Sequence, residues 1–157
     1  MNFYDRSLDR FYSYKNNPSD SSTISSNTVW KIYIDRYKKI WVGTRGGGLD
    51  RFDPLTKTFT HFKNQPSVLN SLGSNQVTSI FEDSFGDLFI GTLSDGISVL
   101  NRNDNTFRVL KNQPGNSNSI ASNSIHEIWE DSKRNLWIGT KTRVFPFYLQ
   151  TGSNLHT

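Results

Sequence analysis

The chain has 157 residues, enough for one domain with a sizeable core. Aromatic residues make up 13% of it and there is one methionine, so the composition favours a β-rich fold over packed helices. The absence of cysteine excludes disulfides, thiolate metal sites and a cysteine nucleophile. The net charge of +4 is spread along the chain without a lysine and arginine run, so we expect no nucleic-acid partner.

The first segment, 1–15, is polar and lacks the continuous apolar run of a signal peptide. No stretch of the sequence reaches the length of a transmembrane helix. We therefore expect a soluble chain, which would meet a membrane only through other parts of a longer parent protein. Export of that parent stays open, because cleavage upstream would remove any signal.

A Gly-Thr pair recurs three times in the chain at a spacing of 48 residues. Ahead of each pair stand a Ser-Asn pair, an aspartate and an aromatic residue at the same offsets. A period of about 40 to 50 residues, built from short strands and turns, is typical of a β-propeller blade. The three copies are Gly43-Thr44, Gly91-Thr92 and Gly139-Thr140, preceded by Asp35, Asp83 and Asp131 and by Trp41, Phe89 and Trp137.

The repeat register extends back to the first residues, where Phe11 and Tyr14 align with Phe59 and Phe62. The chain is therefore predicted to begin in mid-repeat, as one all-β segment of four-stranded antiparallel repeats. Alternating bulky residues and turn sequences predict strands near 28–34, 40–44, 48–53 and 58–63 in the first full copy. The expected divisions are an outer half blade at 1–24, blades at 25–72 and 73–120, and a partial blade at 121–157.

These strands amount to about three blades, whereas a closed propeller typically has 4 to 8. Either the chain is a fragment of a longer protein, or copies of it complete a ring by head-to-tail assembly. In that assembly the outer half blade of one chain would meet the inner half blade of its neighbour. The need of repeat arrays for flanking units favours the fragment. The last copy also carries Pro146, which predicts an edge strand or a strand that leaves the sheet.

The residues that recur in every copy are predicted to build the scaffold. The aspartates should bond backbone groups of the hairpin turn, and the aromatic residues should fill the space between adjacent blades. The Gly-Thr pair should allow a close approach of strands, with the threonine satisfying a backbone group. Only one copy has a glycine in the turn, Gly86, so we expect looser turns where Lys38 and Arg134 replace it.

Positions that differ between copies are more available for a binding site. They lie on the first strand, as Trp30, Thr78 and His126 followed by Lys31, Ser79 and Glu127, and in the loop after each Gly-Thr pair. In a propeller these positions face the central channel and the side of the crossover loops. The alternative is that they are ordinary solvated residues. The ligand-binding candidates are Trp30, Arg45, Ser94, Asp95, His126, Lys141 and Arg143.

Catalysis has little support in the sequence. The three histidines, His61, His126 and His156, occupy unrelated repeat positions, and no metalloprotease or nucleophile-elbow motif occurs. We therefore expect no catalytic residues, no metal site and no cofactor.

The repeats resemble the two-component regulator propeller repeat over nearly the whole chain. The resemblance is carried by Glu82-Asp83 with Leu88-Phe89-Ile90-Gly91-Thr92, and by Glu130-Asp131 with Leu136-Trp137-Ile138-Gly139-Thr140. It implies a periplasmic sensor segment of a hybrid histidine kinase that recognises a glycan or another small ligand, with the kinase itself lying outside this chain. Two alternatives stay open: a structural or protein-binding propeller, and a lyase-type propeller that acts on polysaccharides.

Overall fold

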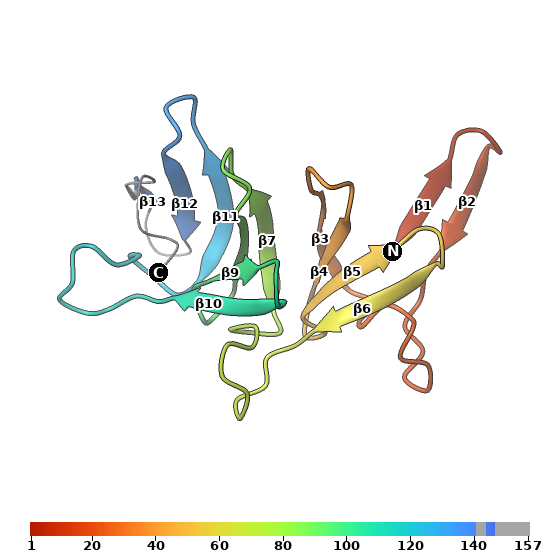
Figure 1. Ribbon diagram of the computed structural model, residues 1–157, viewed down its shortest axis with the longest axis horizontal. Helices are drawn as coiled ribbons and strands as arrows, with labels where there is room; N and C mark the ends of the chain where they lie inside the picture. The colour runs from red at the N-terminus through yellow and green to blue at the C-terminus, as the bar shows by residue number, and fades with distance from the viewer. Residues whose placement is uncertain (141–143, 147–157) are drawn as a thin grey trace.

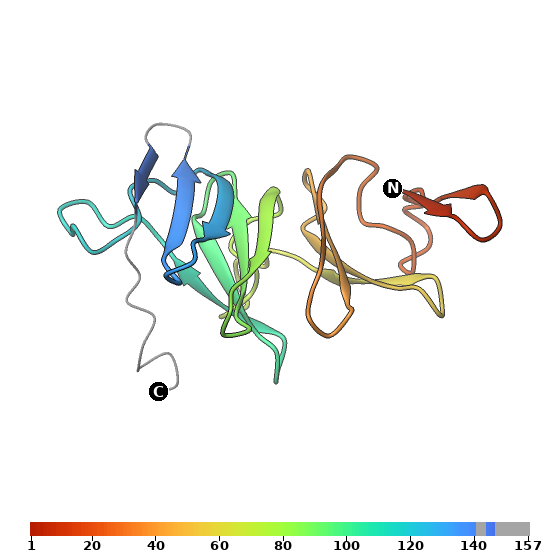
Figure 2. The ribbon, with the colours of Figure 1, turned by 90° about the horizontal axis from the view of Figure 1, so that it is seen from above.

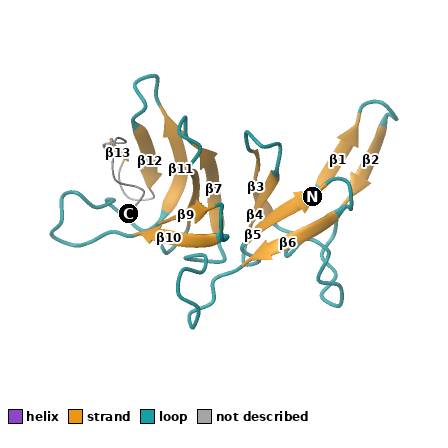
Figure 3. Cartoon of the chain, in the orientation of Figure 1, coloured by secondary structure: helices purple, strands orange, loops and turns teal. Residues whose placement is uncertain are grey.

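The computed structural model describes residues 1–140 and 144–146, and it confirms the all-β prediction. These residues form strands joined by turns and loops, without a helix (Figure 3). Accordingly, the described part of the chain has no helix long and apolar enough to cross a membrane. The strands are β1 (Asn2–Asp5), β2 (Arg10–Ser13), β3 (Val29–Ile34), β4 (Ile40–Thr44), β5 (Leu49–Asp53), β6 (Thr58–Phe62), β7 (Val77–Glu82), β8 (Leu88–Thr92), β9 (Ile97–Asn101), β10 (Thr106–Leu110), β11 (Ile125–Glu130), β12 (Leu136–Thr140) and β13 (Val144–Pro146).

The strands form four antiparallel sheets in chain order. We call them the N-terminal hairpin (β1 and β2), the first blade (β3 to β6), the second blade (β7 to β10) and the third sheet (β11 to β13). They follow one another across the molecule from β1 and β2 to β13, and the first strands of three of them, β3, β7 and β11, lie side by side and are called the innermost strands (Figure 1). Seen from above, the same succession forms an open row (Figure 2). Within the described residues the sheets make no closed ring, as the strand count predicted.

Each blade is a meander in which consecutive strands pair, so its register follows from short hairpin turns. In the first blade Trp41 lies opposite Tyr33 on one side and Arg51 on the other. The corresponding residue of the second blade, Phe89, lies opposite Phe81 and Val99. The two blades thus repeat one backbone plan with different side chains.

Two apolar layers hold neighbouring sheets together. The first seam, between the first and second blades, contains Trp41, Leu49, Leu72, Ile80 and Phe107 among its buried residues. The second seam, between the second blade and the third sheet, has the buried residues Phe89, Ile97, Val99, Ile120, Ile125, Ile128, Leu136 and Ile138. Burial of this apolar surface is the main force that aligns one blade against the next.

The repeated aromatic residues fill these layers as predicted in two of three copies. Trp41 and Phe89 are almost fully buried, in the first and second seam respectively. Trp137 is only half-buried among the described residues. The N-terminal hairpin is joined to the first blade in a similar way, because the Tyr14 ring packs against Phe52 and Phe59 at centroid distances of 4.8 and 5.9 Å.

The glycine of each Gly-Thr pair lies where the next sheet approaches. A Cβ atom on Gly43 would lie 2.6 Å from Val77 Cγ1, and one on Gly91 would lie 2.7 Å from Ile125 Cγ2. Val77 and Ile125 begin the innermost strands of the following sheets. The absent side chain therefore makes room for the neighbouring blade. The threonine bonds a backbone group as predicted: Thr44 Oγ1 and Thr92 Oγ1 each donate to a glycine carbonyl 2.9 Å away.

The turns that lack a glycine are not looser, so that expectation was wrong. Lys38 and Arg134 adopt left-handed φ values of 61° and 66°, while Gly86 has φ 99°. Each of the three donates its backbone N–H to the carbonyl of the turn aspartate, at 2.9 to 3.1 Å. The turn geometry is imposed by these bonds, and the two larger residues accept a conformation that is uncommon for them.

Pro146 ends β13, which pairs with β12 at the last edge of the described sheet. An edge position tolerates proline because the missing backbone donor is not needed by a further strand. β13 is the outermost strand of the third sheet among the described residues, and the edge strand stays a prediction because the segment after Pro146 lies outside them.

Candidate functional site

The innermost strands share one irregularity, and it falls on the predicted site positions. In β3, β7 and β11 the register shifts between residues 29 and 31, 77 and 79, and 125 and 127. Trp30, Thr78 and His126 are the extra residues of these bulges. A bulge redirects a side chain and is common beside binding sites. Trp30 and His126 are exposed, whereas Thr78 donates a hydrogen bond to the Ile125 carbonyl at 2.7 Å.

The next residue of each strand builds a polar link across three sheets. Lys31 Nζ lies 3.1 Å from Glu127 Oε1, and Ser79 Oγ donates to the same oxygen at 2.9 Å. Ser79 is fully buried, while the two charged side chains are partly exposed. These are the equivalent positions of three repeats, so one variable position joins the first blade, the second blade and the third sheet.

The two described loops that follow Gly-Thr pairs, after Thr44 and after Thr92, lie on the side of the crossover loops. Arg45 donates its backbone N–H to the Thr28 carbonyl, and Gly46 donates to the Asn75 carbonyl, both at 2.9 Å. In the second blade Ser94 Oγ donates to Asp95 Oδ2 at 3.0 Å, and Lys111 Nζ bonds Asp95 Oδ1 at 2.9 Å. Asp95 is thus already neutralised.

Of the seven predicted ligand-binding residues, five lie in the described part of the chain. Lys141 and Arg143 lie outside it. Of these five, Ser94 and Asp95 are joined directly by a hydrogen bond. Trp30 and His126 lie on β3 and β11, with β7 between them. The five described candidates therefore lie at the crossover end of their sheets without forming a single compact cluster.

The repeated aspartates have the structural role that was predicted. Asp35 Oδ1 accepts from the backbone of Tyr37 and Lys39, and Asp131 Oδ1 accepts from that of Lys133 and Asn135, all at 2.8 to 3.0 Å. The second oxygen of each accepts from the indole N–H of Trp41 or Trp137 at 2.9 Å.

Asp83 differs because its aromatic partner is Phe89, which has no donor. Its Oδ1 accepts three backbone bonds at 2.9 Å, but its buried Oδ2 has no partner among the described residues. Burial accordingly raises the pKa of Asp83. For Asp35 burial acts in the same direction, but the bonds from Trp41 and Arg102 outweigh it, so its pKa is lowered.

A cluster of charges that sequence reasoning missed closes one end of the first seam. Arg102, in the turn after β9, bonds Asp35 Oδ2 through one guanidinium nitrogen and Glu82 Oε1 through another, both at 2.8 Å. Arg36 Nε lies 3.0 Å from the same Glu82 oxygen. Asp35 and Glu82 are almost fully buried, so Arg102 and Arg36 together supply the two positive charges that compensate these two carboxylates. The available signal was the Glu-Asp pair of the repeat, which gave no indication of its partner.

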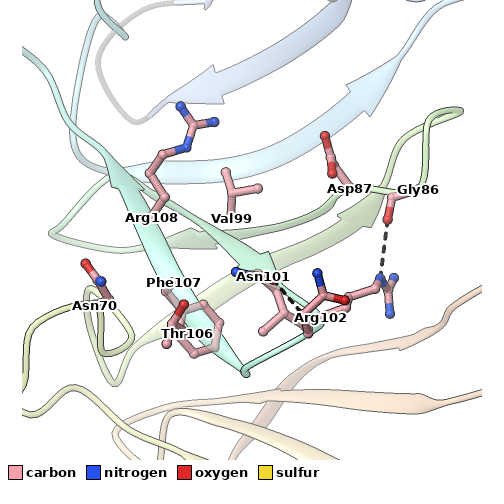
Figure 4. A pocket seen from close by; sticks show the side chains of 11 residues that line it. Asn70, Gly86, Asp87, Val99, Asn101, Arg102, Thr106, Phe107 and Arg108 are labelled. Atoms are coloured by element: carbon pink, nitrogen blue, oxygen red, sulfur yellow. Dashed lines mark hydrogen bonds between the residues drawn. The ribbon is translucent and has the colours of Figure 1, made fainter. Parts of the chain in front are cut away.

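Arg102 also lines two cavities. The larger has a volume of about 520 Å³ and is lined by asparagine amides, the Arg102 and Arg108 guanidinium groups and the edge of Phe107 (Figure 4). The smaller, of about 260 Å³, lies at the first seam and shares Leu100 and Arg102 with it. Neither is lined by any of the predicted ligand-binding residues.

The His61 and Asp50 side chains serve the scaffold. His61 lies 2.7 Å from the buried Asp50 through Nδ1 and 2.8 Å from the Ser21 carbonyl through Nε2, which fastens the crossover loop to the first blade. Within the described residues, no group of three or more histidine, aspartate or glutamate side chains is placed to hold a metal ion.

Comparison with known proteins agrees with this architecture. The family model of the two-component regulator propeller matches residues 23–46 and 71–94. A search of curated proteins finds no significant match. Among solved structures, the extracellular domain of a protein described as a hybrid two-component system of B. thetaiotaomicron aligns with a TM-score of 0.75 and 29% identity, over 97% of this chain and 20% of that one.

Two more distant structures share the fold. One is the extracellular domain of a protein described as a one-component system of B. thetaiotaomicron, with a TM-score of 0.64, 24% identity and coverage of 88% and 18% of the two chains. The other is PorZ, a surface component of the type-IX secretion system of Porphyromonas gingivalis, with a TM-score of 0.57, 16% identity and coverage of 87% and 21%. The chain spans about a fifth of the length of these structures.

The open row of four-stranded meanders defines the chain as a set of β-propeller blades. The segments that match the two-component regulator propeller model cover the inner strands of both complete blades. The resemblance predicted from the sequence is confirmed.

Proposed function

We propose that this chain is a ligand-sensing segment in the extracytoplasmic region of a two-component system protein. The observation that carries the proposal is the family match on both complete blades, together with the similarity to an extracellular domain over 97% of the chain. By this proposal the protein acts in the periplasm and passes the binding event to a kinase elsewhere in its parent. The chain itself contributes recognition and no catalysis.

The ligand class we propose is a glycan fragment or another small extracytoplasmic molecule. The bulges at Trp30 and His126 and the loops at Arg45 and Asp95 support a binding face on the crossover side, because they combine an exposed aromatic ring with polar groups. Aromatic faces with a few placed polar groups are suited to sugars, which present both apolar C–H and hydroxyl surfaces.

A thermal-unfolding screen against oligosaccharides tests recognition. A ligand that binds only the folded state stabilises it by about 2.7 kcal/mol at 100 times its dissociation constant, so a specific glycan should raise the melting temperature in a dose-dependent way. Trp30→Ala should abolish this shift, and Lys133→Ala, on the opposite turn, should leave it intact. A panel without any such shift contradicts the proposal, and the appearance of new reducing ends would indicate the lyase-type alternative.

A second proposal concerns assembly, and a specific observation favours it. Ile32 on β3 is 48% exposed, whereas its counterparts one and two repeats later, Ile80 and Ile128, are 1% and 2% exposed because another sheet covers them. Ile34, two positions further along the same strand, is 59% exposed. The exposed face of β3 is therefore apolar like the buried faces of β7 and β11, but no described sheet covers it. We propose that a further blade covers it, supplied by the parent protein or by a second copy joined head to tail.

Light scattering coupled to size exclusion over a tenfold concentration range distinguishes the two sources. A discrete dimer or trimer would support completion by copies of the chain. A monomer, or association that grows steadily with concentration, would instead support blades of the parent. Ile34→Lys, which places a charge on the uncovered face, should dissolve any dimer while leaving the fold of the chain intact.

A further inference from the structure

The smaller cavity at the first seam is lined by three cationic side chains and no acidic one. Its lining residues are Tyr37, Lys39, Trp41, Arg51, Leu100, Arg102 and Asn105. They come from the β3–β4 turn, from β4 and β5, and from the β9–β10 hairpin of the next blade. The cavity of about 260 Å³ therefore lies between two blades, where ligand sites commonly occur.

The three cations differ in how far the protein neutralises them. Arg102 is bound to Asp35 and Glu82. Lys39 lies near Asp53 and helps to lower the pKa of that carboxyl, after backbone bonds within its turn. The Arg51 guanidinium makes no hydrogen bond or ion pair with any residue in the described part of the chain. Arg51 is thus the cation whose charge the protein leaves uncompensated.

Arg51 is nevertheless held in place. Its guanidinium carbon lies 5.8 Å from the centre of the Trp41 ring and 5.7 Å from that of Phe62, while Arg102 lies 5.0 Å from the centre of the Tyr37 ring. Stacking on aromatic faces orients a guanidinium group and leaves its N–H edge available for a bidentate acceptor. A partly buried, oriented arginine binds such an acceptor with a smaller entropy loss than a mobile surface lysine.

The second seam shows that the scaffold does not require this cation. There the residues one repeat later are Asp87, Phe89 and Val99 in place of Lys39, Trp41 and Arg51. Val99 is buried in the apolar layer with Phe89. A blade of this kind can therefore have an apolar residue at the position of Arg51, so the repeat itself does not require this cation.

We propose that this cavity binds an oxyanion, a carboxylate or a sulfate group carried on a sugar-sized ring. Arg51 and Lys39 would hold the oxyanion, and the exposed Tyr37 ring would lie against the body of the ligand. The adjoining cavity of about 520 Å³, lined by amides and Arg108 and also by the acidic Asp87, gives space for a longer ligand whose further part need not be anionic. The β3–β4 turn lies at the opposite end of the blade from Arg45, so this site is separate from the crossover face and does not depend on the proposed sensing function.

The Trp41 indole N–H gives a direct readout, because Trp41 lines the cavity and donates to Asp35 at 2.9 Å. We would follow its ¹H–¹⁵N resonance during titration of the whole chain with glucuronate, at constant ionic strength. Glucose is the matched neutral probe, and inorganic sulfate tests whether the oxyanion is sufficient without the ring. Saturable movement with glucuronate and none with glucose is expected.

Arg51→Gln keeps the stem of the side chain and removes its charge, so it should weaken glucuronate binding at least tenfold. Lys133→Gln, on an exposed turn of the third sheet, is the matched control and should leave binding unchanged. Equal movement with glucuronate and glucose, equal affinity in Arg51→Gln, or no movement of Trp41 would each overturn the proposal. The dispersion of the remaining resonances verifies that every variant is folded.

Discussion

The two seams of this molecule have the same backbone arrangement but differ in the groups that bond the buried carboxylate of the turn aspartate. In the first seam, both oxygens of Asp35 are bonded, by the turn backbone, Trp41 and Arg102. In the second seam, Asp83 has one oxygen without a partner in the described structure, because Phe89 replaces the tryptophan. The repeat therefore fixes the position of the aspartate, whereas residues that differ between copies determine whether its second carboxylate oxygen accepts a hydrogen bond.

The difference extends to the joint between the blades. A glutamate at the end of β7 accepts from the backbone N–H of Arg36 at 2.8 Å, and its counterpart Glu130 accepts from that of Ser84 at 2.9 Å. This bond is common to both seams. The first adds the guanidinium groups of Arg36 and Arg102, while the second has Ser84 Oγ on Glu130 at 3.0 Å. The bond from a backbone N–H to the glutamate keeps neighbouring blades aligned in both seams, while the side chains around it can differ.

The largest effect should come from removal of the Arg102 guanidinium. Arg102→Met leaves Asp35 and Glu82 buried with one partner fewer each. We expect a loss of about 2 to 3 kcal/mol in the free energy of unfolding, somewhat below that for a fully buried pair since both carboxylates keep other donors. Urea denaturation measures it.

The matched control for Arg102 is a surface pair. Lys111 and Asp95 have side chains that are 52% and 36% exposed, so Lys111→Met should cost less than about 1 kcal/mol. If Arg102→Met were no more costly than Lys111→Met, the charge cluster would have no special part in joining the blades.

The close approach of the sheets gives the next effect. Gly43→Ala and Gly91→Ala would place a methyl group 2.6 to 2.7 Å from a buried branched side chain of the next sheet. We expect each to destabilise the chain by about 1 to 3 kcal/mol in thermal unfolding. Around Gly139 the nearest described atom is 3.7 Å away, so Gly139→Ala should change stability by less than about 0.5 kcal/mol. Similar costs at all three positions would mean that the glycines serve the strand itself and not the seam.

The repeat made most of the fold predictable. Because one period is expressed three times, strand positions could be averaged over copies, and the segments 40–44 and 48–53 match Ile40–Thr44 and Leu49–Asp53 within a residue. The roles of the turn aspartate and of the Gly-Thr threonine followed from their fixed offsets. Each depends on local geometry, which sequence reports well.

The parts that escaped prediction depend on tertiary contacts. Arg102 has Pro54 as its counterpart one repeat earlier, so its bond with Asp35, 67 positions away in sequence, has no repeated pattern behind it. The bulges at Trp30 and His126 are set by pairing with the next strand and do not disturb the alternation of residue types. Lys38 and Arg134 show that turn bonds can override a residue's own preference.

A subtler effect should distinguish the two buried aspartates. Asp35→Asn keeps an oxygen for the backbone bonds but turns the acceptor of Trp41 and Arg102 into a donor, so it should cost about 1 to 3 kcal/mol. Asp83→Asn loses no such bond, and it removes a carboxylate whose pKa burial raises, so its cost should be at least about 1 kcal/mol smaller. Equal costs in chemical denaturation would show that the unpartnered oxygen of Asp83 is bonded in solution.

The smallest effect is a shift in titration at the third sheet. The Trp137 indole, followed by the backbone and side chain of Asn135, lowers the pKa of Asp131 from 3.8 to about 2. Because the folded-state pKa is depressed, the contribution of Asp131 to stability is complete above 3.8 and is lost as pH falls toward 2. Trp137→Phe recreates the aromatic residue of the second blade and should raise the pKa of Asp131 toward 3.8, as followed by carboxyl ¹³C NMR. Asp83, which has a phenylalanine already, serves as the internal reference and should titrate above 3.8 in both proteins. If Asp131 titrated near 2 with or without the indole, the tryptophan would not be what separates the ionisation of these equivalent turns.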